Sequence, residues 1–327
     1  MIVAAVGVTL IAFVISHAVP VDPVVANLGQ QASQRPELVA AFRSKYGLDR
    51  PLYEQYLRFV GGMLHGDLGD ALNTRRPVLT DIKQFLPATV ELSTFAILVA
   101  LVLGIPLGVL SALHRGTPVD HVARFVSLIG VSIPIFWLAI LALVIFYATL
   151  HVTAGPGRLG PGLLAPPAVT GFYLVDSLLA GNLIDFRSAL SQLVLPACVL
   201  ASSIMGLVTR VTRASMLDIL GQDYMRTARA KGLAERVIVI RHGLRNALIP
   251  TVTILGLAYG NLLSGAVMTE TIFAWPGLGR YAFQAATGND FPAIMGVTLV
   301  IALIYLLVNL ATDILYAVLD PQIRYSS

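Results

Sequence analysis

One basic stretch, Arg210–Pro250, holds the side chains best suited to bind a partner. Asp223 is a suitable N-cap for a short helix over Tyr224–Lys231, and Gly232 suits the left-handed position that follows a helix. We predict a second helix over Ala234–Ala247, ending before the proline. Two short helices at roughly a right angle form a lever that can pass a partner's motion to the flanking segments. Charge alone leaves one alternative open, a basic helix resting on anionic headgroups.

A second group of special residues occupies Glu270–Arg280. Trp275 is one of two tryptophans in the chain, and Pro-Gly-Leu-Gly follows it. A Pro-Gly pair favours a tight turn, and the second glycine permits close backbone approach. Glu270 and Arg280 can pair across this turn, where an exposed pair adds about 0–1 kcal/mol. Two interpretations stay open, a tryptophan anchor at headgroup depth or a structured re-entrant turn.

The patterns of a nucleotide-binding, hydrolytic or metal site are missing. The only lysines are Lys45, Lys83 and Lys231, and none follows a glycine or precedes Ser or Thr, so the chain has no Walker A phosphate loop. The single cysteine, Cys198, has no partner for a disulfide or a metal site. We therefore expect no catalytic residue, no metal and no cofactor in this chain.

Ionisable groups are also absent from the middles of the apolar segments. Glu91, Glu270 and Asp313 lie toward segment ends, whereas ion-coupled carriers and pumps usually place such groups inside the membrane. The chain therefore has no evident energy source of its own. It is either a passive pore or takes energy from a partner.

The elements that position these residues are strongly apolar. Of the 327 residues, 56% are hydrophobic and 12% are charged, against about 25% charged in a typical soluble domain. A membrane span needs roughly 20 mainly apolar residues, which predicts an all-α polytopic membrane protein with six transmembrane helices. The six runs without Asp, Glu, Lys or Arg are Met1–Val21, Leu92–His114, Phe125–Leu150, Ser188–Thr209, Asn246–Thr269 and Phe291–Thr312. The first run lacks the basic start and the cleavage site of a signal peptide, which favours a retained helix.

The distribution of basic residues orients these spans. Six spans place both termini on one side, and cytoplasmic loops carry the excess of Lys and Arg. The loops on the terminal side hold Arg115, Arg124, Arg210, Arg213, Arg226, Arg229, Lys231, Arg236, Arg241, Arg245 and Arg324. The short loops opposite hold Arg158, Arg187 and Arg280. We predict cytoplasmic N- and C-termini.

Three regions follow from this topology: a first transmembrane helix over 1–21, an extracytoplasmic segment over 22–85, and a core over 86–327 with a cytoplasmic loop over 210–248. In the outer segment, Pro36 and Pro51 each open an amphipathic helical pattern. These helices can cap the protein's own spans, or lie on the membrane or a partner. Gly and Pro pairs between His151 and Arg187 predict an outer loop without regular structure.

The cytoplasmic loop carries a family resemblance. Asp-Tyr-Met-Arg-Thr-Ala-Arg-Ala-Lys-Gly-Leu (Asp223–Leu233), followed by Arg-His-Gly-Leu-Arg-Asn-Ala-Leu-Ile-Pro (Arg241–Pro250), resembles the EAA loop of ABC importer permeases. The match is to the version seen in dipeptide, oligopeptide and nickel permeases. The general motif has Glu-Ala-Ala where this chain has Arg-Thr-Ala over 226–228. This departure fits the peptide branch.

Further matches to the same family follow in order along nearly the whole chain, and their order makes the set specific. They are Tyr46–Pro51, Gln55–Arg58, Gly66–Gly69, Arg76–Val78, Leu86–Leu92, Ser132–Leu138, Glu270–Arg280, and Asp320-Pro321 with Arg324.

The resemblance implies a type I ABC importer permease fold in the bacterial inner membrane, with an extracytoplasmic helical segment after helix 1. It implies as partners a second homologous permease, two ATPase subunits that hold ATP and Mg, an extracytoplasmic solute-binding protein and the lipid bilayer, and no nucleic acid. The expected function is ATP-driven import of di- or oligopeptides or a related small solute. The alternative is a passive channel or scaffold that is not coupled to ATP.

The resemblance assigns a role to the residues of the cytoplasmic loop, and the turn over 270–280 leads us to a hypothesis for the second group. Coupling to an ATPase subunit is expected of Asp223, Tyr224, Arg226, Thr227, Ala228, Arg229, Ala230, Lys231 and Gly232. The outer gate candidates are Glu270, Trp275, Pro276, Gly277, Gly279 and Arg280. Because the turn offers few groups to a peptide, we expect it to shape the gate rather than to read the substrate.

Cysteine labelling tests the topology. With Cys198 replaced by Ser, Asn73→Cys is expected to react with an impermeant maleimide from the outside. Gln222→Cys is expected to react only after the membrane is opened, because it lies within the predicted cytoplasmic loop. Labelling of both positions from the same face would contradict the six-span orientation.

Overall fold

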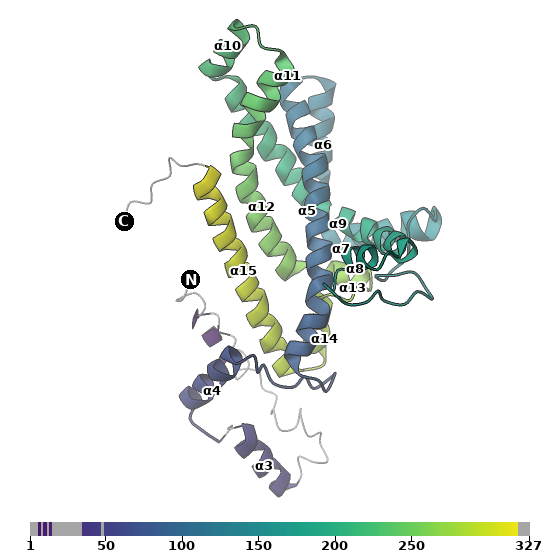
Figure 1. Ribbon diagram of the computed structural model, residues 1–327, viewed down its shortest axis with the longest axis vertical. Helices are drawn as coiled ribbons and strands as arrows, with labels where there is room; N and C mark the ends of the chain where they lie inside the picture. The colour runs from purple at the N-terminus through teal and green to yellow at the C-terminus, as the bar shows by residue number, and fades with distance from the viewer. Residues whose placement is uncertain (1–5, 8, 12, 15–34, 47–48, 320–327) are drawn as a thin grey trace.

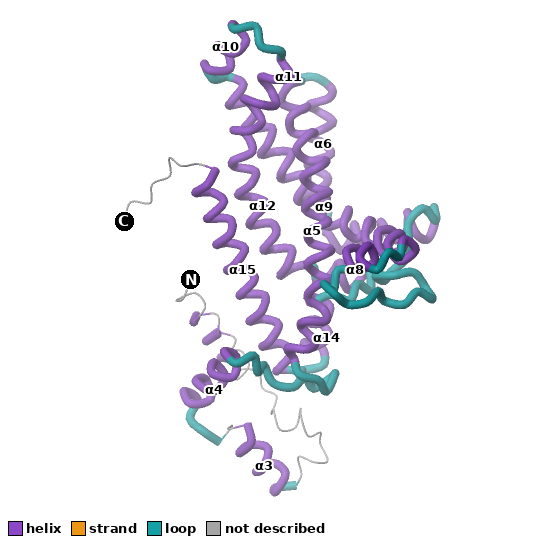
Figure 2. The backbone as a smooth tube through the Cα atoms, in the orientation of Figure 1, coloured by secondary structure: helices purple, strands orange, loops and turns teal. Residues whose placement is uncertain are grey.

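The computed structural model describes residues 6–7, 9–11, 13–14, 35–46 and 49–319. Over these ranges every regular element is a helix, and the long helices form a bundle with α10 and α11 at one end and α14 at the other (Figures 1 and 2). We call these the α10 end and the α14 end. The long helices are α5 (Val78–Leu113), α9 (Leu183–Leu220), α12 (Arg245–Gly265) and α15 (Phe291–Leu319). The shorter elements are α3 (Pro36–Tyr46), α4 (Leu52–Leu64), α6 (Pro118–Ser132), α7 (Ile135–Ala142), the π-helix η1 (Leu143–Thr149), α8 (Tyr173–Leu179), α10 (Asp223–Ala230), α11 (Glu235–Val237), the π-helix η2 (Ile238–Leu244), α13 (Val267–Ile272) and α14 (Leu278–Thr287).

Five of the six predicted spans have counterparts among the described residues. Four single helices are long and apolar enough to cross a membrane, and α6 with α7 and η1 forms a bent fifth candidate. The first predicted span, over 1–21, lies mostly outside the described residues. Within it, the Thr9 hydroxyl lies 2.8 Å from the Tyr56 hydroxyl of α4, and the Phe13 ring contacts the Tyr56 ring edge-on.

The predicted third span is broken rather than straight. Its axis bends by 103° between α6 and α7. The break falls at Ile133, which has φ −84° and ψ 127° and precedes Pro134. A residue before proline is disfavoured in the helical region, so the chain turns there. After the bend, α7 packs Ala139 and Ala142 against the first half of α9.

Two other local predictions are wrong. The helix expected to end before Pro250 continues, because η2 runs directly into α12 and Pro250 lies inside α12. Prolines are tolerated inside membrane helices, where neighbouring groups satisfy the freed carbonyl. The loop between His151 and Arg187 contains α8 and the start of α9, so it has more regular structure than its glycines and prolines indicated.

The helices of the outer segment agree with the prediction. Helix α3 begins at Pro36, and α4 begins directly after Pro51. Helix α5 begins at Val78, well before the uncharged run, so the boundary predicted at residue 85 falls inside this helix.

Helix α9 lies at the centre of the bundle and contacts α5 closely. A Cβ atom at Gly108 of α5 would lie 2.8 Å from the Thr209 carbonyl oxygen and 2.8 Å from Thr212 Cβ. The hydroxyl of Thr209 donates to the carbonyl of Gly104, at 3.1 Å. Small residues that let two backbones meet are the usual basis of helix packing in membranes, where no hydrophobic effect drives association.

Helix α9 meets α6 in the same way. A Cβ atom at Gly206 of α9 would lie 2.4 Å from the Ser127 carbonyl oxygen, and one at Gly130 of α6 would lie 2.4 Å from the Ser202 carbonyl oxygen. The neighbours are backbone atoms, so they cannot move aside without moving a helix. Glycine is required at both positions for α6 to lie on α9.

Replacement of Gly206 by Ala tests this contact. The added methyl is expected to force α6 away from α9 and to lower the free energy of unfolding by about 1–3 kcal/mol, as overpacking does in other interiors. The measurement is the midpoint of thermal unfolding in detergent. Gly61→Ala is the matched control, because a Cβ at Gly61 of α4 meets nothing within 4 Å; that variant should be neutral or slightly more stable. Equal midpoints for the two variants would contradict the packing argument.

Candidate functional site

At the α10 end, α10 packs on the bundle through one face. Met225 and Ala228 are buried together with Ile238 of η2, and all three lie against the end of α9 at Ile219 and Leu220. Met225 and Ala228 are three residues apart, the spacing of one helix face. This apolar contact joins α10 to the end of α9 and to the start of the helix that continues into α12.

The opposite face of α10 is polar and open. The side chain of Asp223 is 96% exposed and that of Arg226 is 74% exposed. Tyr224, Thr227, Ala230 and Lys231 are also exposed. An acidic and a basic side chain therefore stand one turn apart on a surface that the described chain does not cover.

The turn after α10 has the predicted glycine geometry. Gly232 has φ +74°, and its N–H donates to the carbonyl of Arg229, at 2.9 Å. The Arg229 guanidinium bridges the turn to both carboxylate oxygens of Glu235, at 2.8 and 3.2 Å. The predicted N-cap is wrong, since Gln222 holds that position without a side-chain cap bond and Asp223 is the first helical residue. The two predicted short helices are therefore α10 and the beginning of one continuous helix that starts at Glu235.

A buried polar cluster at the same end was not foreseen from the sequence. Asp120, in the first turn of α6, accepts hydrogen bonds from Arg213 of α9 at 2.8 and 2.9 Å. It also accepts from the Ser111 hydroxyl of α5 at 2.6 Å and from the Gly116 N–H at 3.0 Å. Asp120 thus ties the ends of α5, α6 and α9 together. A carboxylate placed just after a helix-opening proline was the signal available in the sequence.

Toward the α14 end, the turn after α13 folds into the protein. Trp275 is 1% exposed, and its indole N–H donates to the carbonyl of Ala88 in α5, at 2.9 Å. Burial excludes the role of tryptophan anchor at the lipid headgroups. The indole instead holds the turn against α5.

The carboxylate of Glu270 is the second anchor of this turn. It accepts hydrogen bonds from the Thr89 hydroxyl of α5 and, at 2.8 Å, from the Arg280 backbone N–H. The Thr89 hydroxyl in turn accepts from the Leu278 N–H, at 2.7 Å. The expected ion pair between the side chains of Glu270 and Arg280 is not among those of the described residues. Burial raises the pKa of Glu270 to about 7, despite the hydrogen bonds that favour its charged form.

The glycines of this turn make room for that carboxylate. A Cβ atom at Gly277 would lie 2.3 Å from the Glu270 carboxyl group, and one at Gly279 would lie 3.0 Å from it. Pro276 precedes Gly277, which has an extended backbone at the start of α14. The Pro-Gly-Leu-Gly sequence thus brings the α14 backbone onto a buried acid.

A buried ion pair lies beside the turn, and the sequence did not indicate it. Arg158, from the Gly-Pro-rich loop, binds the carboxylate of Glu91 in α5, and the two side chains are both 6% exposed. The guanidinium also donates to the Gly171 carbonyl at 2.7 Å and stacks over the Tyr173 ring, 3.7 Å from its centre. The other Glu91 oxygen accepts from the Leu174 N–H at 2.9 Å. This part of α5 therefore holds two segments at once, the turn between α13 and α14 and the loop that precedes α8.

The described residues contain no group of three or more His, Cys, Asp or Glu side chains that could hold a metal ion. The polar groups at the two ends of the bundle instead form hydrogen bonds and ion pairs between helices.

Two family models match this chain. The model described as the binding-protein-dependent transport system inner membrane component matches residues 104–325, and an N-terminal model of the same systems matches residues 1–93.

Several relatives are similar over nearly the whole chain. The probable D,D-dipeptide transport system permease protein DdpB of Escherichia coli (strain K12) is 49% identical, covering 97% of this chain and 93% of its own length. The di/tripeptide transport system permease protein DppB of Pseudomonas aeruginosa (strain UCBPP-PA14) is 43% identical, covering 98% and 94%. The oligopeptide transport system permease protein AppB of Bacillus subtilis (strain 168) is 39% identical, covering 98% and 95%.

Among solved structures, two crystal forms of the inward-facing MetNI methionine ABC transporter match with TM-scores of 0.52 and 0.54. Each match covers 71% of this chain and 93% of the other, at 17% sequence identity. At this identity the likeness concerns the fold, which is that of an ABC importer permease.

Proposed function

Because this chain belongs to the family of binding-protein-dependent transport system inner membrane components, we propose that it is the permease subunit through which such an importer moves short peptides. The relatives with 39–49% identity are named as permeases for D,D-dipeptides, di- and tripeptides, and oligopeptides, which supports peptides as the substrate class. Nothing favours the alternative of a passive channel or scaffold.

The assembly that we propose has a second permease, two ATPase subunits and a solute-binding protein. The absence of a Walker A loop from the sequence supports this division of labour, because the energy then comes from ATP and Mg bound to the partners. The substrate would pass through a cavity between the two permeases.

The exposed face of α10 is the surface that we assign to an ATPase subunit. The observation that carries this assignment is the two-sided structure of α10, with Met225 buried against the bundle and Arg226 exposed. A docked subunit that moves α10 would move the ends of α9 and α12 with it. This assignment places the α10 end in the cytoplasm, which is the side predicted from the excess of Lys and Arg in the loops at this end.

Substitutions in the turn and on the exposed face test coupling. Gly232→Pro is expected to lower peptide uptake and peptide-stimulated ATPase activity at least tenfold, because proline cannot adopt the φ of +74° found here. Arg226→Glu is expected to lower both by reversing the charge that faces the partner. The measurements are made on the reconstituted transporter, with the amount of protein in the membrane determined in parallel.

Two matched variants serve as controls. Gly232→Asn is expected to keep coupling, since Asn tolerates the left-handed conformation. Arg115→Glu reverses a charge at the same end but outside α10, in the loop between α5 and α6, and is expected to be normal. Normal coupling in both Gly232→Pro and Arg226→Glu would refute the docking role and favour a helix that anchors on headgroups.

We assign the turn between α13 and α14 to the outward gate. The support is its position at the junction of α5 with the outer loops, where Trp275 and Glu270 bind Ala88 and Thr89. The indole N–H of Trp275 and the carboxylate of Glu270 already form hydrogen bonds within the protein, so the turn has few polar groups left to recognise a peptide. Opening of the gate would then require this turn and α5 to move as a unit.

Uptake of several peptides separates gating from recognition. Trp275→Ala and Glu270→Gln are each expected to lower uptake of all peptides by a similar factor at saturating solute-binding protein, because the turn loses its hold on α5. Phe283→Ala, in the exposed part of α14, is the control and should have little effect. A changed order of preference among peptides with total uptake intact would place a specificity site here instead.

A further inference from the structure

A groove with an unusual concentration of arginines lies between α6 and α9, near the α10 end. Its volume is about 370 Å³, and its walls include Arg124, Ser127 and Leu128 of α6 with Arg210 and Arg213 of α9. Gly206 lies one turn before Arg210 and lets the two helices touch beneath the groove. The groove is therefore the place where α6 and α9 separate above their closest contact.

The positive charge in this groove exceeds what the described chain neutralises. The carboxylate of Asp120 neutralises part of this charge. It accepts two hydrogen bonds from Arg213 and forms a 3.5 Å ion pair with Arg124. Arg124 also lies 2.7 Å from the Nδ1 atom of His121. Within the described ranges no hydrogen bond or ion pair reaches the Arg210 side chain. Three guanidinium groups with one carboxylate leave an uncompensated positive charge at the mouth of the groove.

The side of the groove away from the α10 end is apolar and exposed. Leu128 and Val131 of α6 are 56% and 46% exposed, and Leu207 of α9 is 36% exposed. Leu128 and Val131 are three residues apart, as are Leu207 and Arg210, so each helix carries an apolar side chain one turn below the charged groups. A ligand that fills this surface needs a negative head and an apolar tail.

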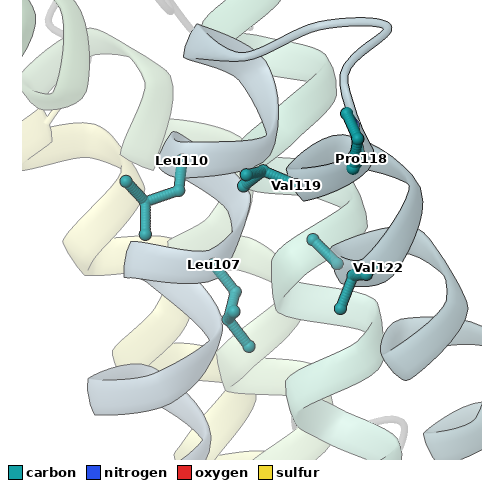
Figure 3. Close-up of a pocket in the computed structure, with 6 residues that line it drawn as sticks. Leu107, Leu110, Pro118, Val119 and Val122 are labelled. Atoms are coloured by element: carbon teal, nitrogen blue, oxygen red, sulfur yellow. The ribbon is translucent and has the colours of Figure 1, made fainter.

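A neighbouring groove provides a useful contrast. The groove between α5 and α6 has a volume of about 310 Å³ and is lined by Leu107, Leu110, Pro118, Val119 and Val122, with no charged side chain among its lining residues (Figure 3). It can accept an acyl chain, but it offers nothing to a headgroup. The arginines therefore distinguish the groove between α6 and α9 from ordinary lipid-facing surface.

We propose that the groove between α6 and α9 binds an anionic phospholipid, with the lipid phosphate between Arg210 and Arg124 and an acyl chain along Leu128 and Val131. Basic pockets between helices at the membrane surface are suited to anionic headgroups. Guanidinium groups bind phosphate oxygens through paired hydrogen bonds. Arg213, held by Asp120, is a fixed charge behind them. The bound lipid would brace α6 against α9 beside the helices that carry α10.

An acidic partner protein fits the same charges less well. The exposed Leu128 and Val131 continue the groove away from the α10 end, into the uncharged part of α6. A soluble subunit that docks at the α10 end would leave this apolar surface uncovered. A free phosphate would leave it uncovered for the same reason.

Lipid retention by the full-length chain tests the proposal. The chain is purified in a neutral detergent containing equal amounts of phosphatidylglycerol and phosphatidylcholine with identical acyl chains, and the bound lipids are counted by native mass spectrometry. The wild-type chain is expected to retain phosphatidylglycerol in preference. Arg210→Gln is expected to lower this preference about fivefold, the contribution of one basic residue near an anionic surface.

A matched variant and three outcomes make the test decisive. Arg236→Gln removes an exposed arginine from α11 at the same end and should keep the wild-type preference. Equal preference in Arg210→Gln and the wild type would overturn the proposal, as would displacement of the lipid by inorganic phosphate at millimolar concentration. An Arg210→Gln variant that keeps its lipid but no longer co-purifies with the ATPase subunits or the second permease would assign the groove to a protein partner.

Discussion

The contact of α9 with α5 and α6 through glycine is the constraint on which the other elements depend. Helices in a membrane gain nothing from burying apolar side chains away from lipid, so they associate through close packing and polar contacts. Gly108, Gly130 and Gly206 let backbone atoms of α9 meet those of its two neighbours. Once these axes are fixed, α12 packs beside α9 and α15 beside α12, and the ends of α5 and α9 carry the loops to which we assign the partners.

Buried charges secure the two ends of this core. Glu91 with Arg158 holds the loop before α8 on α5, and Asp120 with Arg213 holds α6 on α9. A buried ion pair adds little net stability, because desolvation offsets the attraction, but removing one partner costs about 3–5 kcal/mol. These pairs therefore act mainly by specifying which segments meet. Helix α5 takes part in both clusters, through Glu91 at one end and through Ser111, which donates to Asp120, at the other.

The proposed coupling requires that a movement of α10 change the position of the turn between α13 and α14. Helix α10 is joined to α9 and η2 by buried apolar contacts, while its exposed face is the surface that we assign to an ATPase subunit. The turn that holds Trp275 is joined to α5 by hydrogen bonds, and α5 packs along the length of α9. A change in the angle between these packed helices is a physical route from the α10 end to the turn at α13 and α14.

The sequence by itself determined the class of protein and much of its local structure. Uncharged runs located the long helices, Pro36 and Pro51 marked the helices of the outer segment, and Gly232 marked the end of α10, because each signal depends on residues close in the chain. Ordered motifs determined the family. Only the tertiary structure decided that Trp275 is buried, that Glu270 binds Thr89 rather than the Arg280 side chain, and that Asp120 binds Arg213. The partners in these contacts lie 181 and 93 residues apart, and hydrophobic periodicity carries no information about which distant segments meet.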